Sequence, residues 1–281
     1  MSSAPSSRPS ALTGGGIRPP SFSLRGYVLG SAWTYRLLVL VVVGSAWELY
    51  ATRAKLLLVP TFTGTLRGVG QLILDPKVWK AFLISNQALI VGFGIAVVFG
   101  ILLGLGAARY RRVEGFVDPY LSILLVTPMA ALIPILIMSL GVQSLASRVF
   151  LVVVFAIPVV IVNSRAGVRQ VDPGLIEMAT SFGAGEREIW RKILLPGALP
   201  AIMTGVRLGL GRAVTGMVII ELLMVAAGIG GLILNYQGKF QANLLYGVIV
   251  LVVLEALILV SLVRVIEGRV APWTNQTVLR E

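Results

Sequence analysis

Cysteine and histidine are both absent from this chain of 281 residues. Without cysteine the chain can form no disulfide and offers no thiolate to a metal ion. Without histidine it lacks the side chain that most often serves as a general base or a metal ligand. The sequence therefore excludes most metal-site chemistry and most catalytic triads.

Charged residues are also scarce. They make up 13% of the chain, whereas they approach about a quarter of an ordinary soluble domain. Hydrophobic residues make up 57%, and the mean hydropathy is +0.91. This composition predicts an integral membrane protein.

Basic residues outnumber acidic residues by 24 to 12, which gives a net charge of +12. A nucleic-acid partner is one interpretation of this excess. The basic residues stand in short clusters between apolar runs, however, and lack the aromatic interleaving of an RNA-binding face. Lipid headgroups explain the clusters better, so we expect membrane lipid, and no nucleic acid, as a partner.

Six apolar runs come near the roughly 20 residues that a helix needs to cross a bilayer. We expect membrane spans at residues 35–51, 84–108, 117–140, 146–163, 199–226 and 245–264. The expected fold class is thus an all-α integral membrane protein with about six transmembrane helices. The count is open by one, because the first run carries Glu48 near its end and could be a peripheral helix, and the fourth is short and contains Pro158.

The ends of the chain differ from the apolar body. Fourteen of the first 23 residues are Ser, Pro or Gly, a composition that buries too little apolar area to fold. We expect a disordered cytoplasmic tail over residues 1–26, a transmembrane domain over residues 27–270 and a second cytoplasmic tail over residues 271–281.

Lysine and arginine predict the orientation. With the N-terminus in the cytoplasm, the inside segments hold 15 of these residues and the outside segments hold 7. Arg207 and Arg212 lie within a predicted span and complete the 24. The positive-inside rule therefore favours both termini, and the polar stretch at residues 172–200, in the cytoplasm.

That polar stretch interrupts the apolar pattern and predicts a docking element. Asp172 followed by Pro173 is typical of a helix start, because the carboxylate accepts from free amides of the first turn and proline is tolerated at the first helical position. Gly183 is predicted to end this helix as a left-handed C-cap.

A second short helix is predicted over residues 186–194. Glu188 and Lys192 form an i,i+4 pair on one of its faces. Pro196 and Pro200 are predicted to end it.

The spacing of this stretch matches the EAA loop of permease subunits of binding-protein-dependent ABC importers. The residues that carry the match are Glu177, Ala179, Gly183, Ile193, Leu195 and Pro196, with Met178 in place of the middle alanine. Residues 80–270 resemble the nitrate, sulfonate, taurine and bicarbonate branch of that family. Further matching features are Asp118-Pro119, Pro128 and Pro134 before Gly141, Arg207 fourteen positions before Glu221, and Gly228-Ile229-Gly230.

The resemblance implies a type I importer permease fold in the inner membrane of a bacterial cell. It implies three kinds of partner: two cytoplasmic ATPase subunits, an extracytoplasmic substrate-binding protein and a second permease copy, giving a homodimer. ATP and Mg would be bound by the ATPase subunits, and this chain would bind no cofactor, since it contains no G-x-x-x-x-G-K-[ST] sequence. The expected function is import of a small, anionic solute.

The resemblance also implies roles for single residues of the loop. Glu177 and Ala179 would contact the ATPase, Gly183 would set the angle between the two helices, and Leu195 with Pro196 would lead back into the membrane. A solvent-facing helix residue is the alternative interpretation of Glu177.

Charges at membrane depth are costly and usually face a partner or a water-filled cavity. A rise of about 1.5 Å per residue puts Arg212 and Glu255 at a similar depth and Glu221 near the outer mouth. We expect Arg212 and Glu255 to pair. The alternative is that Arg212 lines the pathway and attracts an anionic solute.

Glycine and proline inside the predicted spans have simpler interpretations. Gly100 and Gly104 form a small-xxx-small pair that we assign to helix packing. Pro128, Pro134 and Pro158 are expected to be static kinks.

Two other function classes remain open. A membrane-embedded enzyme has weak support, because the few carboxylates within the predicted spans lie in different layers. An ATP-independent secondary transporter or a channel would also have six spans, but it would need no two-helix docking loop. The sequence leaves the solute unidentified.

Overall fold

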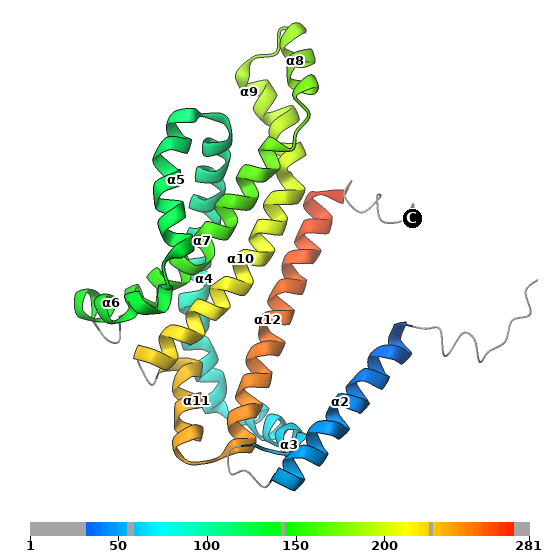
Figure 1. Ribbon diagram of the computed structural model, residues 1–281, viewed down its shortest axis with the longest axis vertical. Helices are drawn as coiled ribbons and strands as arrows, with labels where there is room; N and C mark the ends of the chain where they lie inside the picture. Colours follow the sequence, from blue (N-terminus) through cyan, green and yellow to red (C-terminus); the bar gives the residue numbers. More distant parts are fainter. Residues whose placement is uncertain (1–31, 55–58, 142–143, 225–226, 273–281) are drawn as a thin grey trace, which may run out of the picture. The chain divides into compact units, whose positions relative to one another are not determined.

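The computed structural model describes residues 32–54, 59–141, 144–224 and 227–272, and its regular elements there are all helical (Figure 1). The chain divides into two compact units, Met1–Tyr50 and Ala51–Glu281. Most of α2 (Ala32–Ala54) belongs to the first unit. Its large apolar side chains from Tyr35 to Val43 are all more than half exposed, which is typical of a helix that faces lipid or other helices around its circumference.

Three long helices form the centre of the second unit: α4 (Pro76–Arg109), α7 (Leu145–Arg169) and α10 (Leu195–Met224). Small residues on α4 recur every four positions at Gly92, Ala96, Gly100 and Gly104. A Cβ added at Gly100 would lie 2.8 Å from Val160, and one at Gly104 would lie 2.7 Å from Ser164. The helix-packing role predicted for both glycines is confirmed, because only glycine lets α7 approach so closely.

The remaining helices pack around this centre. Helix α12 (Ala242–Val270) lies against α3 (Phe62–Ile73), where a Cβ on Gly68 would be 2.4 Å from the backbone oxygen of Asn243. Helix α11 (Gly228–Gly238) follows α10. Neither α3 nor α11 was predicted from the sequence, since both helices are too short to span a membrane.

The predicted span at residues 117–140 is wrong as a continuous helix. The chain forms α5 (Arg111–Val126), a 3-10 turn (η1, Met129–Leu132) and α6 (Ile133–Leu140), with a bend of 95° between the two parts. Thr127, which precedes Pro128, is extended at φ −67° and ψ 129°. A residue before proline is driven out of the helical region, so Pro128 breaks the span and does more than kink it.

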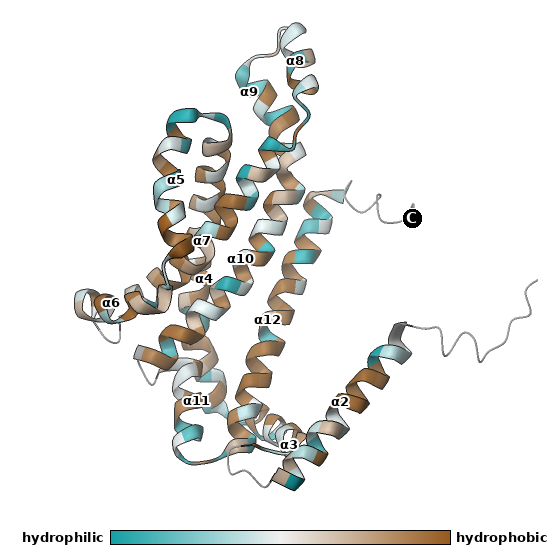
Figure 2. Ribbon diagram, viewed as in Figure 1, coloured by the Kyte–Doolittle hydropathy of each residue, from teal (hydrophilic) through white to brown (hydrophobic). Residues whose placement is uncertain are grey.

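Five helices in the described part are long and apolar enough to cross a membrane, or six if the bent pair counts as one span. Figure 2 shows the apolar residues running along α4, α7, α10 and α12. Helix α7 is longer than predicted and passes through Pro158 without ending. The fold is therefore an all-helical membrane fold.

Candidate coupling site

Helix α8 (Pro173–Ser181) begins as the sequence predicts. The Oδ1 of Asp172 accepts a hydrogen bond of 2.8 Å from the backbone N–H of Gly174, and Pro173 occupies the first helical position. The carboxylate thus satisfies one of the free amides of the first turn.

Gly183 ends α8 in the left-handed conformation, at φ +81°. Its N–H donates to the oxygen of Thr180 at 2.9 Å, and the N–H of Ala184 donates to the oxygen of Ala179 at 3.0 Å. These two bonds form a Schellman motif, which confirms the predicted C-cap. No atom lies within 4 Å of a Cβ built on Gly183, so the backbone angle, and not crowding, requires glycine.

The second helix of the loop does not end at the prolines, so that prediction is wrong. Helix α9 (Glu186–Ile189) continues through a π turn (η2, Trp190–Leu194) into α10. The N–H of Leu195 donates to the oxygen of Trp190, five residues back. Pro196 lies two residues after this π turn, in the first turn of α10, and Pro200 lies further inside α10. The loop and the span therefore form one helical run, Glu186–Leu223.

The inner face of the loop packs on a small apolar cluster. Ile189 and Leu194 are buried there, and Ala179 is partly buried against the same cluster. Ala179 thus joins α8 to the rest of the loop. The contact with the ATPase expected of Ala179 stays a prediction.

Glu177 is exposed on one side of α8, and a different side carries an exposed apolar stripe that was not predicted from the sequence. The stripe consists of Leu175, Met178 at 52% exposure and Phe182 at 85% exposure. Their i, i+3 and i+7 spacing was the available signal, since it places them on one helical face. Ile193 and Pro196 line a groove of about 480 Å³ beside Leu175 and Met178, while Leu195 is exposed.

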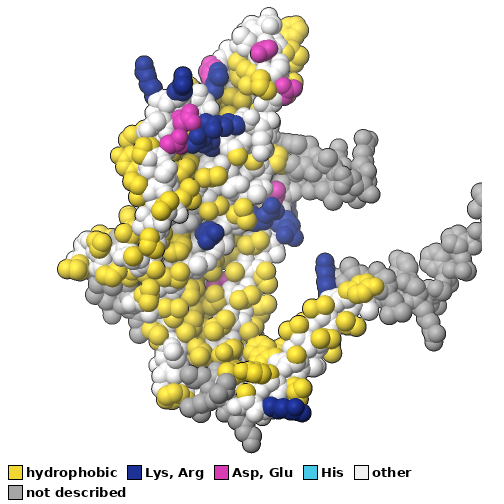
Figure 3. Space-filling model, viewed as in Figure 1, with side chains coloured by type: hydrophobic (Ala, Val, Ile, Leu, Met, Phe, Trp, Pro, Cys, Tyr) yellow, Lys and Arg dark blue, Asp and Glu magenta, His cyan; other side chains and the backbone are white. Residues whose placement is uncertain are grey.

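The loop is also tied to the end of α4. Arg109 donates from Nε and Nη2 to the two carboxylate oxygens of Glu186, both at 2.9 Å. The Nε1 of Trp190 donates to the hydroxyl of Tyr110 at 3.3 Å. In the face shown in Figure 3, basic side chains gather near the end of the bundle that carries α8 and α9. Neither tie was predicted, because each joins residues about 80 positions apart.

A second set of ion pairs fastens α5 to α7 near this end. Glu114 accepts from Arg165 at 2.7 Å and from Arg169 at 2.6 Å. Arg165 also pairs with Asp118. These ion pairs hold α5, the first part of the bent pair, against α7, the helix that precedes the loop.

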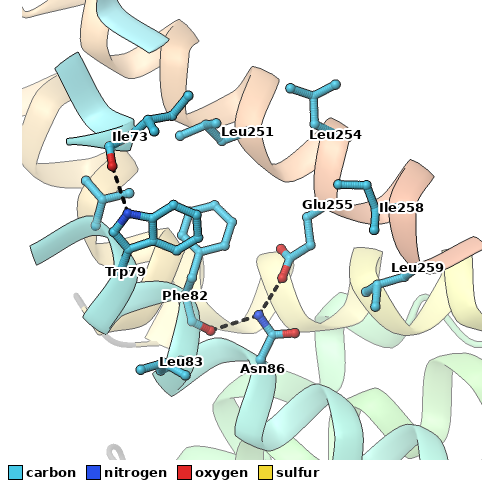
Figure 4. Close-up of a pocket in the computed structure, with 11 residues that line it drawn as sticks. Ile73, Trp79, Phe82, Leu83, Asn86, Leu251, Leu254, Glu255, Ile258 and Leu259 are labelled. Atoms are coloured by element: carbon cyan, nitrogen blue, oxygen red, sulfur yellow. Dashed lines mark hydrogen bonds between the residues drawn. The ribbon is translucent and has the colours of Figure 1, made fainter. Parts of the chain in front are cut away.

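The predicted pair between Arg212 and Glu255 is not formed. Glu255 accepts from Asn86 in an apolar groove between α4 and α12, which Figure 4 shows, and Arg207 instead pairs with Glu267 of α12 at 3.0 Å. Arg212 follows Arg207 by five residues, which turns it by about 140° around a helix of 3.6 residues per turn. It therefore points away from α12.

Glu221 is buried, at 1% exposure, in a polar cluster between α4, α10 and α11. The Oγ of Ser85 lies 2.7 Å from both of its carboxylate oxygens and accepts from the N–H of Ile229 at 2.9 Å. The N–H of Gly230 donates to Oε2 at 3.0 Å, and Arg148 lies 3.9 Å from Oε1. Glu221 and Ser85 thus fasten the start of α11 to α10 and α4, and the carboxylate of Glu221 is buried.

Known proteins resemble this chain in sequence and in fold. The family model for the binding-protein-dependent transport system inner membrane component matches residues 96–275. The SsuC protein of Escherichia coli, named an aliphatic sulfonates transport permease protein, is 31% identical over 78% of this chain and 82% of its own length. The SsuC protein of Bacillus subtilis is 28% identical over 86% and 88%, and the taurine transport system permease protein TauC of E. coli is 29% identical over 72% and 74%.

Among solved structures, an inward-facing form of the MetNI methionine ABC transporter is 25% identical, with a TM-score of 0.50, over 69% of this chain and 93% of that one. The helical fold and the sequence relatives point to the same family. This chain belongs to the family of inner-membrane components of binding-protein-dependent transport systems, and it is a permease subunit of an ABC transporter rather than an enzyme.

Proposed function

We propose that this permease imports small organic sulfonates, with taurine or a simple alkane sulfonate as the solute. The relatives named for aliphatic sulfonates and for taurine support this class, because they align over more than 70% of the chain.

The loop at residues 172–200 is proposed to receive the ATPase. The observation that carries this proposal is the rigid turn at Gly183, which joins an exposed apolar stripe on α8 to a helical run that continues into the membrane. A partner that seats Leu175, Met178 and Phe182 in a groove would move α8 as it moves. The continuous run Glu186–Leu223 would carry that motion into the span as a rigid body.

Glu177, Met178, Gly183, Ile193, Leu195 and Pro196 are the residues proposed for this coupling. Ala179 supports them from the inner face. ATP and Mg would be bound by the two cytoplasmic ATPase subunits, and an extracytoplasmic binding protein would deliver the solute.

We further propose that the permease forms a homodimer and that both of its termini lie in the cytoplasm. The orientation rests on the 15 to 7 distribution of Lys and Arg. The proposed tail at residues 1–26 lies outside the described residues, as does most of the tail at 271–281.

Reconstitution tests the proposal. Proteoliposomes that hold this chain with its ATPase, supplied with ATP and the loaded binding protein, are expected to take up radiolabelled ethanesulfonate or taurine. Flux through liposomes that contain this chain alone, without ATP, would reject the importer in favour of an ATP-independent carrier or channel.

Co-purification tests the docking loop separately. Glu177→Lys is expected to lower recovery of the ATPase, because it reverses an exposed charge on α8, the helix proposed to dock on the ATPase. Lys239→Glu is the matched control, since it reverses one charge next to α11, at the other end of the bundle (Figure 1). Equal recovery with both variants would show that Glu177 is not at the interface.

A further inference from the structure

A concave site opens where the broken span meets the centre of the bundle. It has a volume of about 400 Å³ and is lined by α5, η1, α7 and α10. Side chains that line it include Leu124, Thr127, Pro128, Phe155, Pro158 and Arg212. The break at Pro128 creates the space, because α5 stops there and the chain turns away through 95°.

Arg212 is exposed, and among the described residues it has no carboxylate within ion-pair distance. The other arginines of α4, α7 and α10 have partners. Arg207 pairs with Glu267, and Arg148 donates to the oxygen of Ile84 at 3.1 Å and lies near Glu221. Ion pairs already described hold Arg109, Arg165 and Arg169. A charged side chain at membrane depth is costly without a partner or water. No carboxylate in the described part of the chain therefore neutralises the charge of Arg212.

Along α10, Arg212 lies between the ion pair of Arg207 with Glu267 and the buried Glu221. Arg212 lies about 7.5 Å beyond Arg207 and about 13.5 Å before Glu221, at a rise of about 1.5 Å per residue. Both neighbouring carboxylates, Glu267 and Glu221, are already bonded to other groups. An anion in the concave site would thus meet a free guanidinium and the hydroxyl of Thr127.

We propose that Arg212 is the anion contact of the translocation pathway and holds the sulfonate group as the solute passes the broken span. This inference rests on the proposed function. A guanidinium suits the group, because its planar fork of N–H donors matches two oxygens of an oxyanion. One such contact among apolar side chains binds strongly enough to admit the solute and weakly enough to release it.

Substitution provides the first test, in the reconstituted importer with labelled ethanesulfonate. Arg212→Gln is expected to lower the rate of uptake by about tenfold to a hundredfold, the effect of losing a hydrogen bond to a charged group. Arg212→Lys keeps the charge and is expected to retain part of the rate. The control Arg264→Gln removes another exposed arginine, on α12, and is expected to leave uptake unchanged. Uptake by Arg212→Gln at the wild-type rate would overturn the proposal.

The absence of cysteine allows a second test within one folded preparation. In Arg212→Cys, aminoethyl methanethiosulfonate restores a positive charge at this position and is expected to raise uptake several-fold. Sulfonatoethyl methanethiosulfonate adds a negative charge and is expected to abolish the remaining uptake. The wild-type complex treated with the same reagents accounts for cysteines on the other subunits.

The outcomes separate the two proposals. If the cysteine reacts and both reagents change uptake equally, Arg212 is only a steric wall of the pathway and this inference fails. If the cysteine does not react, the site is closed to water and the inference also fails. If the wild-type importer takes up no sulfonate with ATP, the proposed solute class is wrong whatever Arg212 does.

Discussion

Gly183 is the residue on which the geometry of the loop depends. Its φ of +81° lies in the left-handed region, where a side chain costs about 1–2 kcal/mol. The position has open space, so a larger residue would not clash but would favour a different turn. Such a turn would aim the apolar stripe of α8 in another direction.

Gly183→Val is therefore expected to lower ATP-driven uptake at least several-fold while membrane insertion stays normal. Gly185→Val is the matched control, because Gly185 also has open space but is extended, at φ −74° and ψ 162°. Gly183→Asn should be intermediate, since asparagine tolerates the left-handed region. Membrane expression and ATPase recovery are measured beside uptake. Normal uptake by Gly183→Val would mean that the turn is not a rigid coupler.

Glu221 shows the opposite case, a residue whose role depends on complete burial. Its carboxylate has two hydrogen-bonding partners, the hydroxyl of Ser85 on α4 and the N–H of Gly230 on α11. Gly228 and Gly230 make room for it: a Cβ on Gly228 would lie 2.4 Å from Glu221 Oε1, and one on Gly230 would lie 2.5 Å from Glu221 Cβ. The glycines of Gly228-Ile229-Gly230 are thus explained by their close approach to a buried carboxylate.

Glu221→Ala is expected to destabilise the fold by about 3 kcal/mol or more, because it leaves buried donors without an acceptor. For a unit of this size that corresponds to a fall of about 6–12 °C in the apparent unfolding midpoint. The midpoint can be followed by size-exclusion chromatography of the heated protein in detergent. Glu221→Gln keeps one acceptor oxygen and should lose less. An unchanged midpoint in the alanine variant, like that expected of the exposed Glu188→Ala, would contradict the structural role.

At the scale of elements, the loop is held to the membrane helices from two sides. The π turn η2 makes it continuous with α10, and the ion pair between Arg109 and Glu186 fixes it to the end of α4. Both side chains of that pair are more than a third exposed, so its effect on stability is small. Its contribution is to the relative position of α4 and α9.

A charge exchange isolates that contribution. Glu186→Arg places two arginines opposite each other and is expected to reduce uptake several-fold, while Arg109→Glu together with Glu186→Arg should recover most of it. Uptake in proteoliposomes and ATPase recovery are the measurements. If the double variant is as impaired as the two single losses combined, the pair does not position the loop.

The helices also show which features the apolar pattern of the sequence did not predict. The apolar runs located α4, α7, α10 and α12, because a membrane helix needs a long uninterrupted apolar stretch. They did not reveal the break at Pro128, which depends on how the residue before the proline is accommodated, or the passage of α10 through Pro196 and Pro200. Proline weakens a helix locally, and only the neighbouring turns decide whether it ends.

At the scale of the whole molecule, the orientation in the membrane can be tested directly. The chain has no native cysteine, so single cysteines report their own side. In intact spheroplasts, a membrane-impermeant maleimide is expected to label Lys239→Cys, while Arg187→Cys should react only after the membrane is opened. Labelling in the reverse order would invert the proposed topology and place the loop away from the cytoplasmic ATPase.

The sequence by itself determined the membrane class, the approximate spans, the loop and its left-handed glycine. These features follow from local chemistry: apolar length, helix capping and the backbone freedom of glycine. Only the tertiary structure decided the partners of the charges. Glu255 bonds to Asn86, Glu221 to Ser85 and Gly230, and Arg207 to Glu267, while Arg212 is left facing a concave site. Depth along a helix is readable from residue number, but the face that meets a neighbour depends on helix rotation and packing, which sequence spacing does not contain.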